Sequence, residues 1–390
     1  MTQLCDHNHC TGCSACVAVC PKGCIRMEAD GEGFLYPKVD ESNCINCGKC
    51  AKACPVLNPP QKAERLPAGY AAYTKDETVR KDSSSGGIFT EIAKVVLQQG
   101  GAVFGAAYSD RFEVVHICVE DLHDLEKLRG AKYAQSNLRD SFLQAKHRLE
   151  NGQTVLFSGT PCQIAGLKSF LGRSYENLLT VDFVCHSVPS PMAWEQYVRY
   201  RSGQDNNGNL PVAINLRNKE TGWSRYQYSN VFAYDNGVTH MSPSGNSLYM
   251  KLFVGGYISR KSCEMCQFKG YNRCSDLTIG DFWGIWDIAP EMDDNKGTSL
   301  ILVQTLPGEK LFAKIADQLE WKQVTLEETS RQNPAMLRTT QAAENRTEIL
   351  ALIRRGKFEK CLRIMQQKHQ VRHLFRRMLS WGKTNRQKER

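Results

Sequence analysis

Hydrophobic residues recur along the chain with the spacings of amphipathic helices and buried strands. In residues 86–99 they fall on one face of a helix, which predicts a helix with one buried side. These positions are Ile88, Ile92, Val95 and Val96. Residues 101–109 and 113–120 are short apolar runs and predict two strands, and residues 138–149 predict another helix.

Two later segments share one arrangement, in which an apolar strand leads through a turn and a Cys into a helix. Residues 154–171 place Cys162 after such a strand, and residues 178–200 place Cys185 in the same way. The carboxyl ends of strands in open α/β sheets are the usual ligand-binding edge. We therefore expect both thiols to lie at a binding edge.

The rest of the pattern predicts a mixed fold. Residues 212–240 read as antiparallel strands, with Asp235-Asn236-Gly237 as a hairpin turn. Residues 299–305 predict one more strand and residues 308–319 another helix. The fold class is therefore α/β (α+β mixed), with an antiparallel portion.

Composition separates the N-terminal region from the rest. Residues 1–60 are dense in Cys, Gly and Pro and lack long periodic runs, as expected of a small domain organised by metal. Residues 56–69 contain three Pro and read as a linker. The length of 390 residues allows two or three domains. No apolar run reaches 18 residues, which argues against a spanning helix, and the first residues do not form a secretory signal.

Positive charge is concentrated in residues 346–390, which we call the basic tail. The tail holds 14 Lys and Arg against 3 Asp and Glu, whereas the rest has 36 basic and 38 acidic residues. This distribution argues against specific nucleic-acid binding. Hydrophobic residues of the tail have the spacing of an amphipathic helix. They are Val371, Leu374, Phe375, Met378 and Leu379.

The predicted helix of the basic tail has three interpretations. It can dock on a partner protein, lie solvated at the chain end, or bind a membrane surface through its basic residues and Trp381. The expected location is accordingly the cytoplasm, with peripheral contact to the inner face of the membrane under the third interpretation.

Ten of the 17 Cys residues lie between Cys5 and Cys54. In a reducing compartment, clustered thiols more often bind metal than form disulfides. Two runs have the spacing C-x2-C-x2-C-x3-C-P, beginning at Cys10 and at Cys44. Zinc is the alternative, but two identical four-Cys runs ending in Pro fit separate tetrahedral zinc sites poorly.

This spacing predicts two 4Fe–4S clusters. Three thiolates of one run bind one cluster, and the fourth Cys of each run binds the other cluster. One predicted ligand set is Cys10, Cys13, Cys16 and Cys54, and the second is Cys44, Cys47, Cys50 and Cys20. Cys5 and Cys24 lie outside this pattern and are interpreted as incidental thiols.

Five further Cys residues form a third candidate group. They are Cys162, Cys185, Cys263, Cys266 and Cys274. A CxxC pair such as Cys263 and Cys266 is compatible with a metal site or with redox disulfide chemistry. From spacing alone, a metal site is favoured over structural thiols.

Several motifs of the main region occur together in a characteristic order. They are Gly159-Thr160-Pro161-Cys162-Gln163, Asp182-Phe183-Val184-Cys185-His186, Ser262-Cys263-x2-Cys266, and the run from Ser275 to Gly284. Through them, residues 68–345 resemble the family of coenzyme F420 hydrogenase/dehydrogenase beta subunits. Residues 1–60 resemble bacterial two-cluster ferredoxins. The chain thus divides into a ferredoxin domain (1–60), a main domain (68–345) and the basic tail (346–390).

The resemblance implies that the main domain binds FAD and a third 4Fe–4S cluster. By the resemblance, the cluster ligands are Cys162, Cys185, Cys263 and Cys266, with Cys274 as an alternative to one of them. The family usually has Gly after the Cys-His pair, where this chain has Ser187.

Two segments are candidates for contact with the flavin. Residues 83–90 precede a predicted helix, and a helix N-terminus with small residues favours a phosphate, although a plain Ser cap is the alternative. Residues 129–136 match a second motif of the family, in which Lys132 pairs with phosphate or with the reduced flavin. An exposed Lys on a loop is the alternative. The predicted contacts are Ser85, Gly86, Gly87, Thr90, Lys132, Tyr133, Gln135 and Ser136.

The expected function is that of an iron–sulfur flavoprotein oxidoreductase. Its clusters exchange electrons with a redox partner protein or ferredoxin, and its flavin exchanges hydride with a small organic substrate or a deazaflavin coenzyme such as F420. His186 and Lys132 are the candidates for proton transfer, although a hydrogen-bonded core His is the alternative for His186. Similar architectures in bacterial polysaccharide clusters imply a role in polysaccharide or envelope biosynthesis. The rival hypothesis is a non-catalytic electron-relay subunit.

Overall fold

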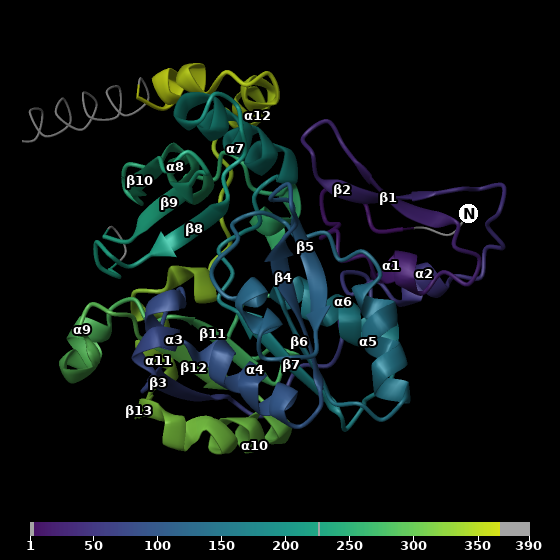
Figure 1. The fold of residues 1–390 in the computed structure, drawn as a ribbon. Helices are drawn as coiled ribbons and strands as arrows, with labels where there is room; N and C mark the ends of the chain where they lie inside the picture. The colour runs from purple at the N-terminus through teal and green to yellow at the C-terminus, as the bar shows by residue number, and fades with distance from the viewer. Residues whose placement is uncertain (1–3, 225–226, 367–390) are drawn as a thin grey trace, which may run out of the picture.

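The computed structural model of the chain describes residues 4–224 and 227–366 (Figure 1). Its centre is an eight-stranded sheet in the order β13-β3-β12-β11-β7-β6-β4-β5. The middle strands β11, β7, β6 and β4 run parallel, and the flanking strands pair antiparallel. The bounds are β3 Ala68–Thr74, β4 Ala102–Tyr108, β5 Val114–Val119, β6 Val155–Gly159, β7 Leu178–Phe183, β11 Leu277–Asp281, β12 Ser299–Val303 and β13 Leu319–Val324.

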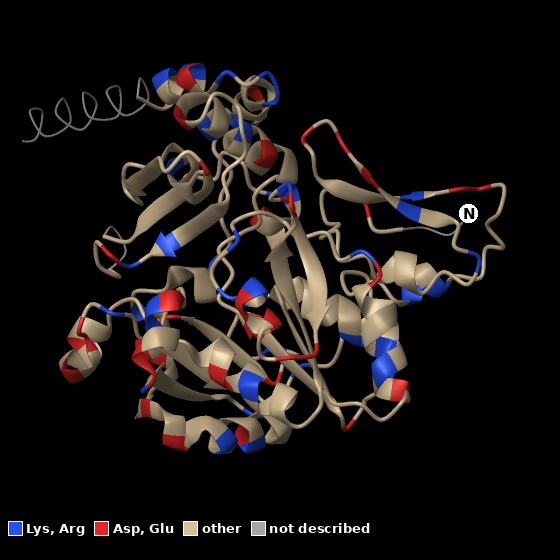
Figure 2. Cartoon of the chain, in the orientation of Figure 1, with Lys and Arg blue, Asp and Glu red and all other residues tan. Residues whose placement is uncertain are grey.

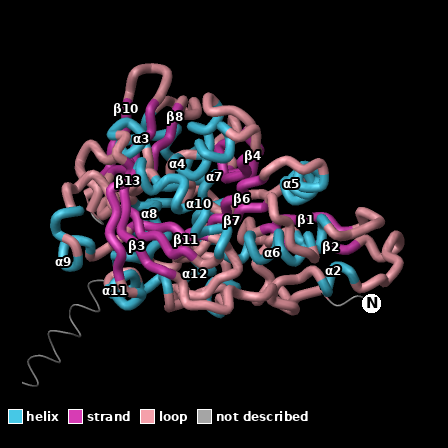
Figure 3. Tube along the Cα trace, turned by 90° about the horizontal axis from the view of Figure 1, so that it is seen from below, coloured by secondary structure: helices cyan, strands magenta, loops and turns pink. Residues whose placement is uncertain are grey.

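Helices cover both faces of this sheet because the middle strands are apolar on both sides. Along β4, Val103 belongs to a core with α4 and α10, whereas its neighbour Phe104 belongs to a core with α5 and α6. Figure 3 shows the strands between these helices from below. The bounds are α4 Ile88–Gln98, α5 Ser141–Glu150, α6 Pro161–Leu171 and α10 Leu306–Ile315; the short helices α3 Glu77–Asp82, α9 Ile285–Ile288 and α11 Leu326–Arg331 lie at the β3 and β12 side.

A second layer consists of a three-stranded antiparallel sheet and three helices. The strands are β8 Ala213–Asn218, β9 Ser229–Ala233 and β10 Thr239–Pro243, and the helices are α7 Pro191–Asp205, α8 Leu248–Val254 and α12 Arg346–Arg354. Trp194, Phe232 and Tyr249 form the centre of their common core. The N-terminal domain comprises the hairpin of β1 Ile25–Ala29 and β2 Leu35–Val39 with the single-turn helices α1 Ala15–Ala18 and α2 Lys49–Lys52.

The predicted mixed α/β fold is confirmed, and most predicted elements are present. Residues 57–67, within the predicted linker, contain no helix or strand. The helix predicted over 308–319 begins earlier and ends earlier, as α10. The Thr305 hydroxyl accepts a hydrogen bond from the Gly308 amide and fixes that start, and β13 begins at Leu319.

The predicted boundary at residue 346 is wrong. Ile349, Ile353 and Phe358 are buried in the core around α7, so residues 346–366 belong to the main body. The missed signal was the apolar spacing within α12, which the high density of basic residues obscured. The amphipathic helix predicted at 371–379 lies outside the described residues. Among the described residues, none of the helices combines the length and apolar character needed to cross a membrane.

Two buried Arg side chains hold the N-terminal hairpin against the main domain. Arg346 donates two hydrogen bonds to the Glu32 carboxylate at 2.8 and 2.6 Å. Arg260 donates to the Leu35 carbonyl oxygen at 3.0 Å and lies over the Tyr36 ring. Elsewhere, basic and acidic residues are interspersed along the drawn elements (Figure 2).

A helix glycine allows the two domains to approach closely. A Cβ atom on Gly166 of α6 would lie 2.9 Å from both Cβ and Sγ of Cys13, which is closer than such atoms pack. The loop of residues 10–16 therefore rests directly on α6, the helix that also carries Cys162. A larger residue at position 166 must separate the two.

We expect Gly166→Ala to weaken this contact. The added methyl group forces a shift that costs about 1–3 kcal/mol of unfolding free energy, as overpacking does elsewhere. The measurement is the thermal unfolding midpoint of protein purified without oxygen, with its iron content. Gly203→Ala in α7 is the matched control, because nothing lies within 4 Å of its Cβ position. An equal effect of both substitutions would contradict the prediction.

Candidate functional site: three thiol-lined hollows and a large cavity

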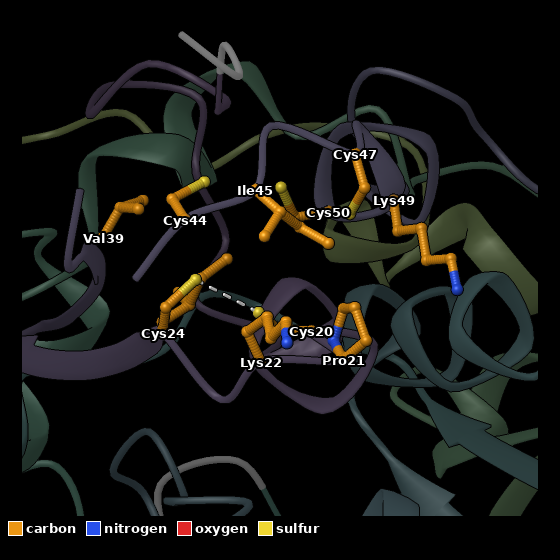
Figure 4. A pocket seen from close by; sticks show the side chains of 11 residues that line it. Cys20, Pro21, Lys22, Cys24, Val39, Cys44, Ile45, Cys47, Lys49 and Cys50 are labelled. Carbon is orange, nitrogen blue, oxygen red and sulfur yellow. Dashed lines mark hydrogen bonds between the residues drawn. The ribbon is translucent and has the colours of Figure 1, made fainter. Parts of the chain in front are cut away.

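The Cys residues predicted to bind iron line three small hollows. The first contains Cys10, Cys13, Cys16 and Cys54, with Cys5 beside them. The second contains Cys44, Cys47, Cys50 and Cys20, with Cys24 beside them (Figure 4). The third contains Cys162, Cys185, Cys263 and Cys266. Each hollow thus contains the four thiols predicted for one cluster.

Backbone geometry explains why the two N-terminal loops can each present three thiols. Positive φ angles occur at equivalent positions, at Gly12 (68°) and Ser14 (61°) in the first loop, and at Asn46 (51°) and Gly48 (72°) in the second. This left-handed conformation, which Gly and Asn adopt most easily, curls each loop around its hollow. One-turn helices follow and direct Cys20 and Cys54 to the opposite hollow.

Cys5 and Cys24 lie closer to the hollows than expected. Cys24 Sγ is 3.4 Å from Cys20 Sγ, and Cys5 interacts with Cys54. Each lies beside a predicted fourth ligand, so the sequence pattern alone identifies which thiol of each pair belongs to the repeated motif. Among the described residues, no three His, Cys, Asp or Glu side chains lie close enough together to hold a single metal ion. Cluster ligands bind different corners of a cubane and need no such proximity.

The third hollow is assembled from separate parts of the chain. Cys162 lies in the first turn of α6. Thr160 and Gln163 form a capping box at the N-terminus of this helix. Cys185 follows β7, and Cys263 lies in the 3₁₀ turn of residues 261–265. Cys274 does not line this hollow and packs beside the α5 and α6 core instead. Position therefore favours the first ligand set over the alternative with Cys274.

Burial controls the protonation of these thiols. It raises the pKa of Cys162, Cys185 and Cys263 to about 12. In the absence of metal the three thiols are therefore protonated at neutral pH. Iron binding must release these protons, because thiolates are the ligands that iron requires.

A cavity of about 1400 Å³ lies at the carboxyl ends of the parallel strands. It extends between the large sheet and the second layer, where Tyr228 of the three-stranded sheet region and Phe253 of α8 form its far wall. This is the binding edge expected from the sequence. Residues 362, 365 and 366 also line it, so the end of the described chain is part of the wall.

Most of the predicted flavin contacts line this cavity. They are Ser85, Gly87, Thr90, Lys132, Tyr133 and Ser136. Gly86 instead packs against the sheet, where its amide donates to Ser299 Oγ at 2.9 Å. Gln135 points to the N-terminal domain, with Nε2 donating to the Thr11 carbonyl oxygen at 2.9 Å. Gly86 and Gln135 therefore do not line the cavity, although their neighbours do.

One end of the cavity carries hydrogen-bond donors. The N-terminus of α4 borders it, and no side chain caps that helix. Arg217 of β8 reaches the same place and donates to the Ser84 carbonyl oxygen at 3.0 Å. Its guanidinium is held by Asp281 at 2.7 and 2.9 Å, yet its buried Nε has no partner. Sequence reasoning missed Arg217, because a lone Arg in a strand carries no motif.

Lys132, His116 and His186 are among the titratable side chains that line the cavity. Burial lowers the pKa of Lys132 to about 7, and its ammonium group donates to the carbonyl oxygens of Lys127 (3.0 Å) and Arg129 (2.7 Å). Burial also lowers the pKa of His116 and of His186 to about 4. Both imidazoles are thus neutral at pH 7. His116 Nδ1 and His186 Nε2 are buried without a hydrogen-bonding partner.

The third hollow and the large cavity share one wall. Residues 185–188, which include His186, line both spaces. Thr11 and Arg260 line the third hollow as well, and Thr11 also borders the first. The first hollow, the third hollow and the cavity therefore follow one another through shared residues.

Comparison with known proteins places the chain in a family. The models described as coenzyme F420 hydrogenase/dehydrogenase, beta subunit (N-term and C terminus) match residues 69–142 and 152–328, respectively. A 4Fe-4S dicluster domain matches residues 9–58. The chain belongs to the family of coenzyme F420 hydrogenase/dehydrogenase beta subunits. This confirms the family and the N-terminal two-cluster domain that the sequence motifs indicated.

Individual relatives are more distant. The chain is 26% identical over 174 residues to a subunit of the F420H2 dehydrogenase of Methanosarcina mazei, which is 42% of this chain and 49% of the relative. The match therefore spans about half of that relative's length. A chain from the F420-reducing NiFe hydrogenase complex of Methanosarcina barkeri aligns with 77% of this chain and 92% of its own length, at 15% identity and a TM-score of 0.42.

We expect Cys263→Ser to remove one of three clusters. Bound iron should fall from about twelve to about eight atoms per chain, since a cubane holds four iron atoms. The matched control is Cys274→Ser, which should keep the full iron content because Cys274 lies outside the third hollow. Iron analysis of protein purified without oxygen makes the measurement. Full iron in Cys263→Ser, or equal loss in both variants, would contradict the ligand assignment.

Proposed function

We propose that this protein is an iron–sulfur flavoprotein oxidoreductase that exchanges hydride with a deazaflavin coenzyme such as F420 or another small organic substrate. The proposal rests on one observation. The first hollow shares a lining residue with the third hollow, and the third hollow shares lining residues with the large cavity, so the three spaces are neighbours. When bound, the clusters supply one-electron transfer and a flavin supplies two-electron hydride chemistry. The match to the family of beta subunits supports the same class of reaction.

The cavity residues fit FAD. A volume of about 1400 Å³ exceeds the usual range of pockets for drug-sized molecules, so a dinucleotide and a second molecule can be accommodated. The uncapped start of α4 and the free Nε of Arg217 provide donors for phosphate. Lys132 provides a cation whose protonation changes near neutral pH.

The residues between cavity and third hollow have definable roles. His186 is neutral and packs edge-on against Phe253, with ring centroids 5.1 Å apart. It can hold or pass a proton at Nε2 without adding a fixed charge. Lys269 anchors the same segment by donating to the carbonyl oxygens of Cys185 and His186. The shared wall is therefore kept in place from one side.

The test is to measure iron and flavin in protein purified without oxygen and then supply electron donors. We expect about twelve iron atoms and one flavin per chain. Reduced F420, nicotinamides and reduced ferredoxin are then compared by the bleaching of the flavin and cluster absorbance. About eight iron atoms and no flavin would leave only the N-terminal clusters and would favour the relay hypothesis. The proposed role in polysaccharide or envelope biosynthesis rests on the sequence resemblance alone.

The second hollow is where a redox partner would dock. Cys47 is exposed, and the neighbouring Ile45 side chain is 56% exposed. Lys22 and Lys49 line it and Lys52 ends the adjoining helix α2; all three are exposed, and none forms an ion pair within the described residues. In Figure 4 the Lys49 side chain extends away from the thiols. This combination suits a partner with carboxylates around an apolar contact, such as an acidic ferredoxin.

We expect the double substitution of Lys49→Glu with Lys52→Glu to slow electron exchange with a reduced acidic ferredoxin. The association rate at low salt should fall about tenfold, and its salt dependence should weaken. Stopped-flow absorbance of cluster reduction makes the measurement. The control is Lys310→Glu with Lys314→Glu on the distant helix α10, which changes the net charge by the same amount. Equal slowing by both double variants would point to net charge rather than docking.

A further inference from the structure

Arg260 differs from every other buried Arg of the described residues. Four of them have a carboxylate partner: Arg80 pairs with Asp294, Arg217 with Asp281, Arg273 with Asp182 and Arg346 with Glu32. Arg260 is fully buried and forms no ion pair with any described carboxylate. A buried charge without a counter-charge is strongly unfavourable. Some other negative group must therefore offset it.

The hydrogen-bonding partners of the Arg260 guanidinium are neutral groups. Its guanidinium donates to the carbonyl oxygens of Cys10 (2.8 Å) and Leu35 (3.0 Å) and to Gln135 Oε1 (2.8 Å). The Tyr36 ring lies below it, with the centroid 4.0 Å from Cζ. Burial raises the pKa of Tyr36 to about 12, so its phenol is neutral at pH 7. None of these groups balances a full positive charge.

Arg260 lies between the first and third hollows and organises both. Its side chain binds the first ligand position, Cys10, through the carbonyl oxygen. Its own carbonyl oxygen accepts from the Cys263 amide at 3.1 Å and starts the turn that carries a ligand of the third hollow. It also lines the third hollow directly. The close packing of Cys13 on α6 brings the two hollows together at this point.

We propose that Arg260 is the shared counter-charge of the first and third clusters and raises the reduction potentials of both. This inference rests on the proposed function, which places clusters in both hollows. Four thiolates around an oxidised cubane leave a net charge of about −2. One electron added to either cluster makes that charge more negative, and a nearby buried cation stabilises the reduced form. Lys269 lines the third hollow and not the first, whereas Arg260 lines the third hollow and donates to the carbonyl oxygen of Cys10, a predicted ligand of the first.

The experiment is a potentiometric titration with dithionite, followed by electron paramagnetic resonance, on the full chain with its clusters. In Arg260→Gln, two of the three clusters should become at least tenfold harder to reduce. For a one-electron couple this corresponds to about 59 mV towards more negative potential. The second cluster gives the remaining signal. Its equilibrium constant for reduction should change less than threefold. Arg260→Lys keeps the charge and should recover most of the wild-type potentials.

Arg346→Gln is the matched control for anchoring. Arg346 is equally buried and holds the same hairpin, but Glu32 already neutralises it. In Arg346→Gln, the equilibrium constant for reduction of each of the three clusters should stay within threefold of its wild-type value. If Arg260→Gln and Arg346→Gln shift the potentials equally, the effect is structural and the proposal fails. Full iron with unchanged potentials in Arg260→Gln overturns it as well.

A second variant decides the matter if Arg260→Gln loses iron or fails to fold. Gln135→Glu places a carboxylate where the amide oxygen now accepts from Arg260 at 2.8 Å, and so neutralises the guanidinium without removing it. The same two clusters should shift in the same direction as in Arg260→Gln. Unchanged potentials in this variant would falsify the proposal. Failure of the proposed function is recognised separately, by wild-type protein with about eight iron atoms and no flavin.

Discussion

The direct contact between the loop of residues 10–16 and α6 is the constraint on which the rest of the site depends. Only a glycine at position 166 lets the Cys13 side chain reach the helix backbone. The same helix starts with Cys162, so this contact sets the spacing between the first and third hollows. A domain joined only by the linker of residues 57–67 would not hold that spacing. The buried Arg side chains 260 and 346 fix it from the hairpin side.

Repeated local spacing made the N-terminal ligands predictable, whereas the third set needed more. In each of the two C-x2-C-x2-C-x3-C runs, the first three Cys residues lie in one short loop, so local spacing alone brings them together. The two loops have residues with positive φ at equivalent positions. Cys162, Cys185 and Cys263 lie on different elements, and only the fold brings them into one hollow. Periodicity likewise predicted α4 and the parallel strands β4, β6 and β7, because each has a regular apolar pattern, but it did not predict the parallel strand β11. It could not predict the strand order.

Contacts with other parts of the chain determine which residues of the predicted segments line the cavity. Gly86 and Gln135 belong to the predicted segments, yet Gly86 contacts the sheet and Gln135 the N-terminal domain, while their neighbours line the cavity. Arg217 was missed for the opposite reason, since it comes from β8, far in sequence from both predicted segments. The residues 346–366 were assigned to a basic tail because their net charge hides the apolar face that packs on α7. In each case a long-range contact decides the role.

Charge placement connects these contacts to chemistry. At the cavity, Arg217 is neutralised by Asp281, so it offers directed donors there without a strong unbalanced field. Between the hollows, Arg260 has no such partner and its full charge acts on what surrounds it. Burial keeps His116 and His186 neutral, so the basic side chains of the cavity lining are Arg129, Lys132, Arg217 and Lys251. The protein thus places two neutral imidazoles on the cavity wall and an unpaired buried guanidinium between the first and third hollows.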